Sequence, residues 1–131
     1  MSTVPRANEY LVISRGKWDA HASPQDVQRA IDQFYAWLER KVAEGKMRTG
    51  SRLQPEARIV SRAGITDGPF AETKELIGGY WHIIAGSLDE AAEIAAENPC
   101  KAFGLGYEIR PLDPERAVVT TIANETPESW R

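Results

Sequence analysis

The sequence predicts an α+β domain in which one antiparallel sheet carries two helices on one of its faces. Two segments, Pro24 to Glu44 and the stretch from Ser87 to Pro99, combine helical apolar periodicity with helix-capping residues. Short apolar segments bounded by glycine and proline lie before, between and after them, as expected of strands. The resulting order of strand, helix, two or more strands, helix and strand is the ferredoxin-like split pattern.

The first strand and the first helix have clear boundaries in the sequence. The compact apolar run at residues 9–14 is typical of a buried strand, and it ends near Gly16. Ser23 is placed to cap a helix whose first position is Pro24, and Gly45 ends that helix. Its apolar stripe contains Val27, Ala30, Ile31, Phe34, Leu38 and Val42, with Trp37 beside it.

The middle of the chain predicts two further strands and a hairpin. Residues 46–55 indicate a strand of polar character that ends at its proline. Residues 56–64 indicate another, and their final glycine suggests a hairpin turn into the next segment. We expect Asp67-Gly68-Pro69 to form a turn, because aspartate often opens turns, glycine permits positive φ and proline restricts φ.

Residues 75–86 predict a central strand that contains Gly78 and Gly79. Glycines inside a strand mark a bulge or a close approach to the backbone, here by the first helix or by a bound ligand. Ser87 is placed to cap the second helix, and Glu90 completes a capping box. The residues expected on the inner face of this helix are Leu88, Ala91, Ala92, Ala95 and Ala96.

The last predicted strand covers residues 106–112 and is ended by prolines. Beyond it, residues 118–122 either add an edge strand or belong to a tail that drapes over a neighbouring molecule. We therefore expect a single domain over residues 1–131, with a core at about 8–112 and a C-terminal extension at 113–131.

A second apolar face of the sheet predicts a homodimer. The segments Tyr10 to Ile13 and Tyr80 to Ile84 are apolar at positions of both parities, whereas a sheet with one solvated face would alternate. The two helices of one chain cover one face only. We therefore expect a second subunit whose sheet packs face to face on the first.

The composition narrows the function class. The 131 residues carry a net charge of -3. This balance argues against direct contact with nucleic acid or with an anionic membrane, since both favour a basic face. No apolar run approaches the roughly 20 residues of a membrane span, and the N-terminus lacks a signal-peptide core. The single cysteine, Cys100, is expected to be packed, and it fits a cytoplasmic protein.

The run "DGPFAETKELIGGYWHI", followed by "SLDEAAEIAAENP", resembles the DGPF-domain proteins of the YCII-related superfamily. Leu53-Gln54-Pro55 and the closing "YEIRPL" are similar as well, so the resemblance covers roughly Tyr10 to Leu112. It implies ferredoxin-like subunits that form a dimeric α+β barrel. It implies no particular reaction, and it points to an extracytoplasmic-function sigma factor as a partner, because many such proteins are encoded beside one.

One branch of this superfamily, the YciI-like proteins, carries a His–Asp pair at positions that neighbouring prolines define. Aligned on those prolines, this sequence has Asp26 and Asn98 instead. Asparagine cannot act as a carboxylate base, and aspartate cannot replace an imidazole near neutral pH. The resemblance therefore argues against hydrolase, dehalogenase or isomerase chemistry at this position.

Candidate ligand-binding residues lie in two polar segments. Arg52 and Gln54 share a strand face with Arg48 in the predicted register, where they either lie exposed or line a cavity between two sheets and bind a carboxylate or phosphate. Thr73 and Lys74 belong to a segment that is either a solvated connector or a polar rim above that cavity.

Three further residues complete the predicted site. Asp67 caps its turn or contacts a ligand, and Tyr80 is a ligand-binding candidate on the same strand face as His82. Asp67 and His82 are the candidate catalytic residues, although a lone histidine in an apolar strand is commonly a core residue. No His, Cys, Asp and Glu spacing indicates a metal, and no glycine-rich loop indicates a phosphate cofactor.

Two functions from different classes follow. In the first, a small cytoplasmic homodimer binds a small organic molecule between its sheets, and a simple proton transfer is the chemistry open to it. In the second, the protein is a non-catalytic regulatory or interaction module linked to an extracytoplasmic-function sigma factor. The polar rim and the glycine pair favour the first, whereas the missing His–Asp pair favours the second.

Overall fold

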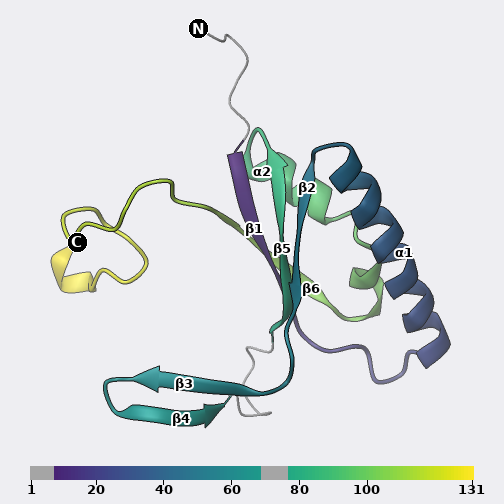
Figure 1. Ribbon diagram of the computed structural model, residues 1–131, viewed down its shortest axis with the longest axis horizontal. Coiled ribbons are helices and arrows are strands. Elements are labelled where there is room, and N and C mark those ends of the chain that lie inside the picture. Colours follow the sequence, from purple (N-terminus) through teal and green to yellow (C-terminus); the bar gives the residue numbers. More distant parts are fainter. Residues whose placement is uncertain (1–7, 69–76) are drawn as a thin grey trace, which may run out of the picture.

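The computed structural model describes residues 8–68 and 77–131 of the chain. Four antiparallel strands form a sheet in the order β2-β5-β1-β6, and two helices cover one of its faces (Figure 1). The elements are β1 (Asn8–Arg15), α1 (Pro24–Ala43), β2 (Met47–Arg52), β5 (Ile77–Ala85), α2 (Leu88–Ala95) and β6 (Gly106–Pro111). The predicted ferredoxin-like α+β fold is confirmed. In the described part of the chain, no helix has the length and apolar character needed to cross a membrane.

The helix boundaries follow the predicted caps. The Ser23 hydroxyl accepts a hydrogen bond from the backbone N–H of Asp26 (3.1 Å), and Gly45 adopts positive φ (74°) just beyond the end of α1. In α2, the Ser87 hydroxyl accepts from the N–H of Glu90 (3.1 Å). The Glu90 carboxylate accepts from the N–H of Gly86 (3.1 Å), which completes the cap.

The predicted inner face of α2 is wrong in part. Ala91 and Ala95 are buried as expected, together with Ile94, but Leu88 is 44% exposed. Ala92 and Ala96 are exposed as well. The buried stripe instead consists of Ala91 and of the residues three and four positions later, which is the spacing of one helix face.

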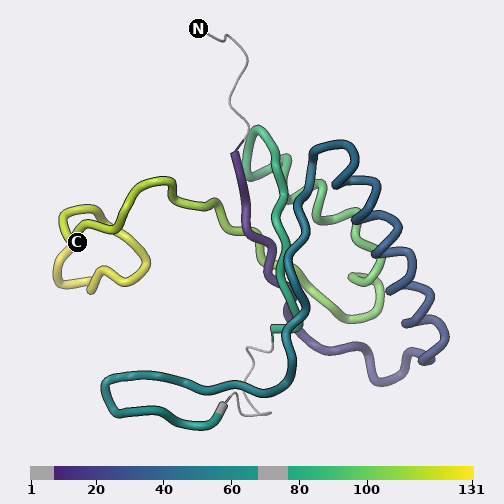
Figure 2. The backbone as a smooth tube through the Cα atoms, in the orientation of Figure 1, coloured from purple at the N-terminus to yellow at the C-terminus, as the bar shows by residue number. Residues whose placement is uncertain are grey.

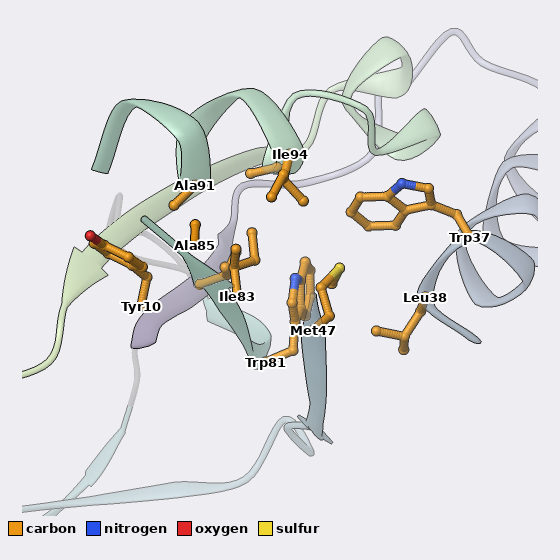
Figure 3. Close-up of a cluster of buried hydrophobic side chains, with 11 residues drawn as sticks. Tyr10, Trp37, Leu38, Met47, Trp81, Ile83, Ala85, Ala91 and Ile94 are labelled. Atoms are coloured by element: carbon orange, nitrogen blue, oxygen red, sulfur yellow. The ribbon is translucent and has the colours of Figure 1, made fainter. Parts of the chain in front are cut away.

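The core lies between the sheet and the helices (Figure 3). On β1 and β5 the buried positions alternate with half-buried ones, so one strand face packs on the helices. Trp81 and Ile83 point into this core and His82 points the other way, as the predicted parity required. The core side chains are Tyr10, Val12, Trp37, Leu38, Met47, Trp81, Ile83, Ala85, Ala91, Ile94 and Ala95.

The glycine pair in β5 forms the predicted bulge. Ser14 is paired with Gly79 and Arg15 with Ile77, so Gly78 is the extra residue. A Cβ atom on Gly79 would lie 2.8 Å from the backbone oxygen of Ser51. In this structure the group that approaches the glycine backbone is strand β2, and not the first helix.

A second irregularity, in β2, overturns the predicted row of Arg48, Arg52 and Gln54. Arg48 is paired with His82 and Ser51 with Tyr80, so β2 carries one extra residue between these pairs. One extra residue reverses which face each later side chain takes. Arg48 and Ser51 therefore share a face, Arg52 lies on the opposite one, and Gln54 follows the end of the strand.

A separate hairpin joins the ends of β2 and β5 in the sequence. Its strands are β3 (Ala57–Ser61) and β4 (Gly64–Gly68), and Gly64 has the positive φ (125°) that the predicted hairpin turn favours. Asp67 and Gly68, the first two residues of the predicted turn, are the last residues of β4. Asp67 lies opposite Arg58, and its carboxylate binds the Arg58 guanidinium (3.3 Å). Pro69 lies outside the described residues.

Beyond β6 the chain leaves the sheet and curves back on itself (Figure 2). The predicted edge strand at residues 118–122 does not form. The extension is closed instead by local hydrogen bonds, from the Arg131 guanidinium to the carbonyl of Ala123 (3.0 Å) and from the N–H of Ala123 to the Thr126 hydroxyl (2.8 Å). Whether this tail drapes over a neighbour stays a prediction.

Glu97 links α1 to the end of α2. Its carboxylate accepts from the indole N–H of Trp37 (3.2 Å) and binds the Lys41 ammonium (3.1 Å). Burial acts to raise the pKa of Glu97, but the hydrogen bonds from Trp37 and Lys41 and nearby positive charge outweigh it, so its pKa is lowered.

We expect Glu97→Gln to lower the free energy of unfolding at pH 7 by about 0.5 kcal/mol, because Glu97 is partly exposed and solvent screens its ion pair. A lowered folded-state pKa stabilises the fold above the unfolded value of about 4.3 and loses that effect as the pH falls. The difference between variant and wild type should therefore vanish near pH 3. Urea unfolding at both pH values measures it, with Glu93→Gln on α2 as the control, and a difference independent of pH would contradict it.

Candidate ligand-binding cavity

A cavity of about 950 Å³ lies between α1 and the end of the sheet where β1 finishes and β5 begins. Small residues create this space, because Ser14 and Gly79 occupy the helix-facing positions there. Toward the other end of the sheet, the pair Tyr10 and Ile83 fills the equivalent positions and packs in the core. The volume lies within the range of roughly 300 to 1,000 Å³ that is typical of small-molecule pockets.

Aromatic side chains form one continuous wall of this cavity. The Phe34 ring lies 5.1 Å from the Trp81 ring, and the Trp81 ring lies 5.6 Å from that of Tyr107, measured between centroids. Tyr35 extends the wall along α1, with its ring 5.2 Å from that of Phe34. Such a surface favours a flat, apolar ligand that can stack on or meet the rings edge to face.

A few charged side chains border the cavity. Lys17 lies in the loop after β1, Arg52 is the last residue of β2, and Glu39 is on α1. Two cations and one carboxylate among the described lining residues favour a ligand with an anionic group. The arginine can bind a carboxylate or phosphate through two parallel hydrogen bonds.

Cys100 and Tyr107 lie on the deep side of the cavity. Burial raises the pKa of the Cys100 thiol, an effect that a hydrogen bond with Tyr107 partly offsets. Burial also raises the pKa of Tyr107 well above its usual value. Both groups are therefore neutral near pH 7. The Cys100 thiol approaches the carbonyl of Ala30 (3.6 Å) as a packed residue and not as an activated nucleophile.

Of the residues predicted for the site, Arg52 and Tyr80 border this cavity. In the strand register Tyr80 lies on the same face as His82, away from the helices, whereas Arg52 lies on the face that α1 covers. Gln54 lies after the end of β2, and Asp67 is on the exposed β3–β4 hairpin, so neither is brought to the cavity. Thr73 and Lys74 lie outside the described residues. The predicted cavity between two sheets needs a second subunit, whereas this one is formed by a single chain.

His82 lies on the opposite side of the sheet from the helices. It is paired with Leu11 of β1 and with Arg48 of β2, and the Tyr80 ring meets it edge-on (6.1 Å between centroids). Its Nδ1 atom is buried and has no hydrogen-bond partner in the described part of the chain. Since His82 does not border the cavity, it is not positioned to act on a ligand there.

The positions that carry the His–Asp pair in YciI-like proteins have structural roles here. Asp26 is exposed in the first turn of α1 and binds Arg29 (3.1 Å). Asn98 is 1% exposed, and its Oδ1 atom accepts from the N–H of Cys100 (2.9 Å) at the start of an unpredicted 3-10 helix, Pro99–Phe103. Across residues 8–68 and 77–131, no three His, Cys, Asp or Glu side chains are grouped as a metal site requires.

The sequence predictions missed most of the cavity. Tyr35 and Glu39 lie just beside the apolar stripe of α1, and Lys17 and Trp18 lie in the loop that precedes this helix. The sequence did contain a signal for the cavity. The apolar stripe of α1 carries a large aromatic residue, Phe34, and it faces strands rich in glycine and serine. Large side chains on one layer and small ones on the other leave space between them.

These features define a ferredoxin-like α+β protein with a pocket between its sheet and its longer helix. The sequence model of the YCII-related domain family matches residues 9–114, and the chain belongs to this family. It is also 38% identical over 98 residues to an uncharacterised protein of Rhizobium meliloti (strain 1021), a match that covers 69% of this chain and 78% of that protein.

Proposed function

We propose that this protein binds a flat, largely apolar organic anion in the cavity between α1 and the sheet. The observation that carries the proposal is the aromatic wall of Phe34, Trp81 and Tyr107 beside the cations Lys17 and Arg52. The rings supply apolar contact area, and the cations orient a carboxylate or a similar group toward the opening. The wall and the cations come from different elements, so folding is needed to bring them together.

Glu39 is the side chain to test for proton transfer on a bound ligand. It is the carboxylate that borders the cavity within the described residues, and it projects from the same helix as Phe34 and Tyr35. Cys100 and Tyr107 are poor bases in this role, because each is neutral and has a raised pKa. Any catalysis in this cavity would therefore depend on Glu39 or on groups of the ligand itself.

We also propose that the protein forms a homodimer, because one face of its sheet is apolar and is left uncovered by the described helices. The face of the sheet opposite the helices, here called the open face, carries the apolar or aromatic side chains of Leu11, Ile13, Tyr80, His82 and Ile84. In a single chain no described helix covers this face (Figure 1). Packing of two open faces would bury them in a sheet-on-sheet interface.

The ligand proposal is tested with 2-naphthoate and its neutral analogue 2-naphthamide, using tryptophan fluorescence. We expect naphthoate to bind more tightly than naphthamide, and Arg52→Gln to weaken naphthoate binding about tenfold, which corresponds to roughly 1.4 kcal/mol. Arg29→Gln, on the exposed side of α1, is the matched control and should leave binding unchanged. Val42→Trp should weaken both probes, because Val42 borders the cavity and a larger side chain would fill it.

Equal binding of the two probes to wild type and to Val42→Trp would show that this cavity is not the site. If a folded protein binds neither probe, the alternative is favoured. That alternative is a non-catalytic regulatory or interaction module, for which we propose an extracytoplasmic-function sigma factor as the partner.

A further inference from the structure

We propose that the β3–β4 hairpin, residues 57–68, is an arm that clasps a second copy of this chain. This inference rests on the proposed homodimer and adds the element that holds the two subunits together. Among the described helices and strands, β3 and β4 pack extensively only on each other. An isolated two-stranded hairpin is marginally stable in water, so the arm is expected to gain a partner.

The apolar side chains of the arm lie in its outer half. Val60 is paired with Ile65 one position in from the pair that closes the turn, and Ile59 is paired with Thr66 one position further in. Val60 and Ile65 are 74% and 72% exposed, and Ile59 is 47% exposed. Closer to the body of the subunit the pairing is polar, because Arg58 faces Asp67. The apolar surface therefore lies where this chain's own core does not reach it and another molecule can.

The direction of the arm identifies that molecule. The arm leaves the lower end of the sheet on the side away from α1 and α2, which is the side of the open face (Figure 1). The C-terminal extension lies on the same side (Figures 1 and 2). A subunit packed on the open face would therefore lie beside the arm.

The length of the arm is sufficient for this contact. Each of its strands has five residues, which span roughly 16 Å in an extended conformation. Two packed sheets are separated by about 10 Å. The outer half of the arm, with Val60 and Ile65, would consequently reach beyond the facing sheet to the edge of the second subunit.

Charge also favours a second copy over a strongly charged partner. On the open face, Glu108 binds Arg15 (2.6 Å) and Arg110 (3.3 Å), and Glu9 binds Arg48. Each of these charges has a partner within one chain, and together they leave a single net positive charge, so two such faces can meet without strong like-charge repulsion. On the arm, Arg58 and Asp67 neutralise each other in the same way. A surface that is largely apolar and whose charges are paired within the chain is suited to isologous pairing.

The first test is sedimentation equilibrium of the full chain. We expect wild type to be a dimer, Ile65→Asp to raise its dissociation constant at least tenfold, and Leu88→Asp to leave it unchanged. Leu88 is an exposed apolar residue on the helix side, so it controls for the loss of an apolar surface residue. An unchanged dissociation constant for Ile65→Asp would contradict the proposed role of the arm without contradicting the homodimer. A monomeric wild type would overturn both, but not the ligand proposal, which the naphthoate probes test separately.

A second measurement does not depend on the stability of a variant dimer. Val60 is replaced by the photoreactive residue p-benzoylphenylalanine, and ¹⁴N-labelled and ¹⁵N-labelled chains are mixed before irradiation. We expect cross-linked peptides that combine the two isotopes, and few of these from the same replacement at Leu88. Cross-links confined to single chains would contradict the proposed contact between the arm and the second subunit, even if sedimentation shows a dimer.

Discussion

Gly79→Ala is expected to lower the free energy of unfolding by about 2 to 3 kcal/mol. The new methyl group would lie 2.8 Å from the backbone oxygen of Ser51 and 3.2 Å from the Cα of Arg52, so strand β2 must move to relieve the contact. Backbone atoms cannot rotate away as a flexible side chain can. Because Arg52 borders the cavity, the same movement should also weaken naphthoate binding. Urea unfolding and the fluorescence titration measure the two effects.

Gly78→Ala is the matched control. Among the described residues its methyl group would meet only the Ser14 hydroxyl, at 3.8 Å, which is an ordinary contact. Neither glycine has a positive φ, so backbone strain does not distinguish the two substitutions. We expect Gly78→Ala to change stability by less than about 1 kcal/mol in either direction. Equal losses of unfolding free energy for the two variants would mean that the close approach of β2 is not the reason for a glycine at position 79.

Asn98→Asp is expected to cost about 3 kcal/mol of folding stability at pH 7. The amide is 1% exposed, its Oδ1 atom accepts from the N–H of Cys100, and its Nδ2 atom has no partner in the described part of the chain. A carboxylate would place a charge there with one donor to satisfy it. Burial would raise the pKa of the new group above its unfolded value of about 3.9, so the penalty should shrink as the pH falls and the group is protonated.

Unfolding of Asn98→Asp and wild type at pH 7 and pH 4 tests this sign. Asn98→Ala serves as the control, because it removes the cap on Cys100 without adding charge, and its cost of about 1 kcal/mol should not depend on pH. If Asn98→Asp were as stable as wild type at pH 7, the site would accommodate a carboxylate. The aspartate that YciI-like proteins carry at this position would then be compatible with this fold.

Local signals in the sequence predicted the helices and strands well. Ser23 and Ser87 begin their helices and Gly45 follows the end of one, through hydrogen bonds and a dihedral angle that involve only neighbouring residues. The bulge at Gly78 was predicted for the same reason, since a glycine pair in an apolar strand is a local departure from strand composition. The pairing of Asp67 with Arg58 was not predicted, because a local turn signal does not indicate which residue of another strand lies opposite.

The face of each side chain in β2 was not predictable from local pattern. Regular alternation places Arg48 and Arg52 together, but the extra residue opposite β5 separates them. That residue is set by the fit between two strands, with Gly50 so close to the Tyr80 carbonyl that an added Cβ would lie 2.1 Å from it. The same fit brings Arg52 to the cavity and leaves Arg48 on the open face, bound to Glu9.

The sequence by itself determined the α+β class, the order of the elements, the caps of both helices and the apolar character of both sheet faces. These follow from periodicity and from residues close together in the chain. Only the tertiary structure decided that the cavity lies between α1 and the sheet and that the hairpin stands clear of the subunit. A cavity is the volume that side chains from distant elements fail to fill, here Ser14 and Gly79 opposite Phe34, and no local pattern contains it.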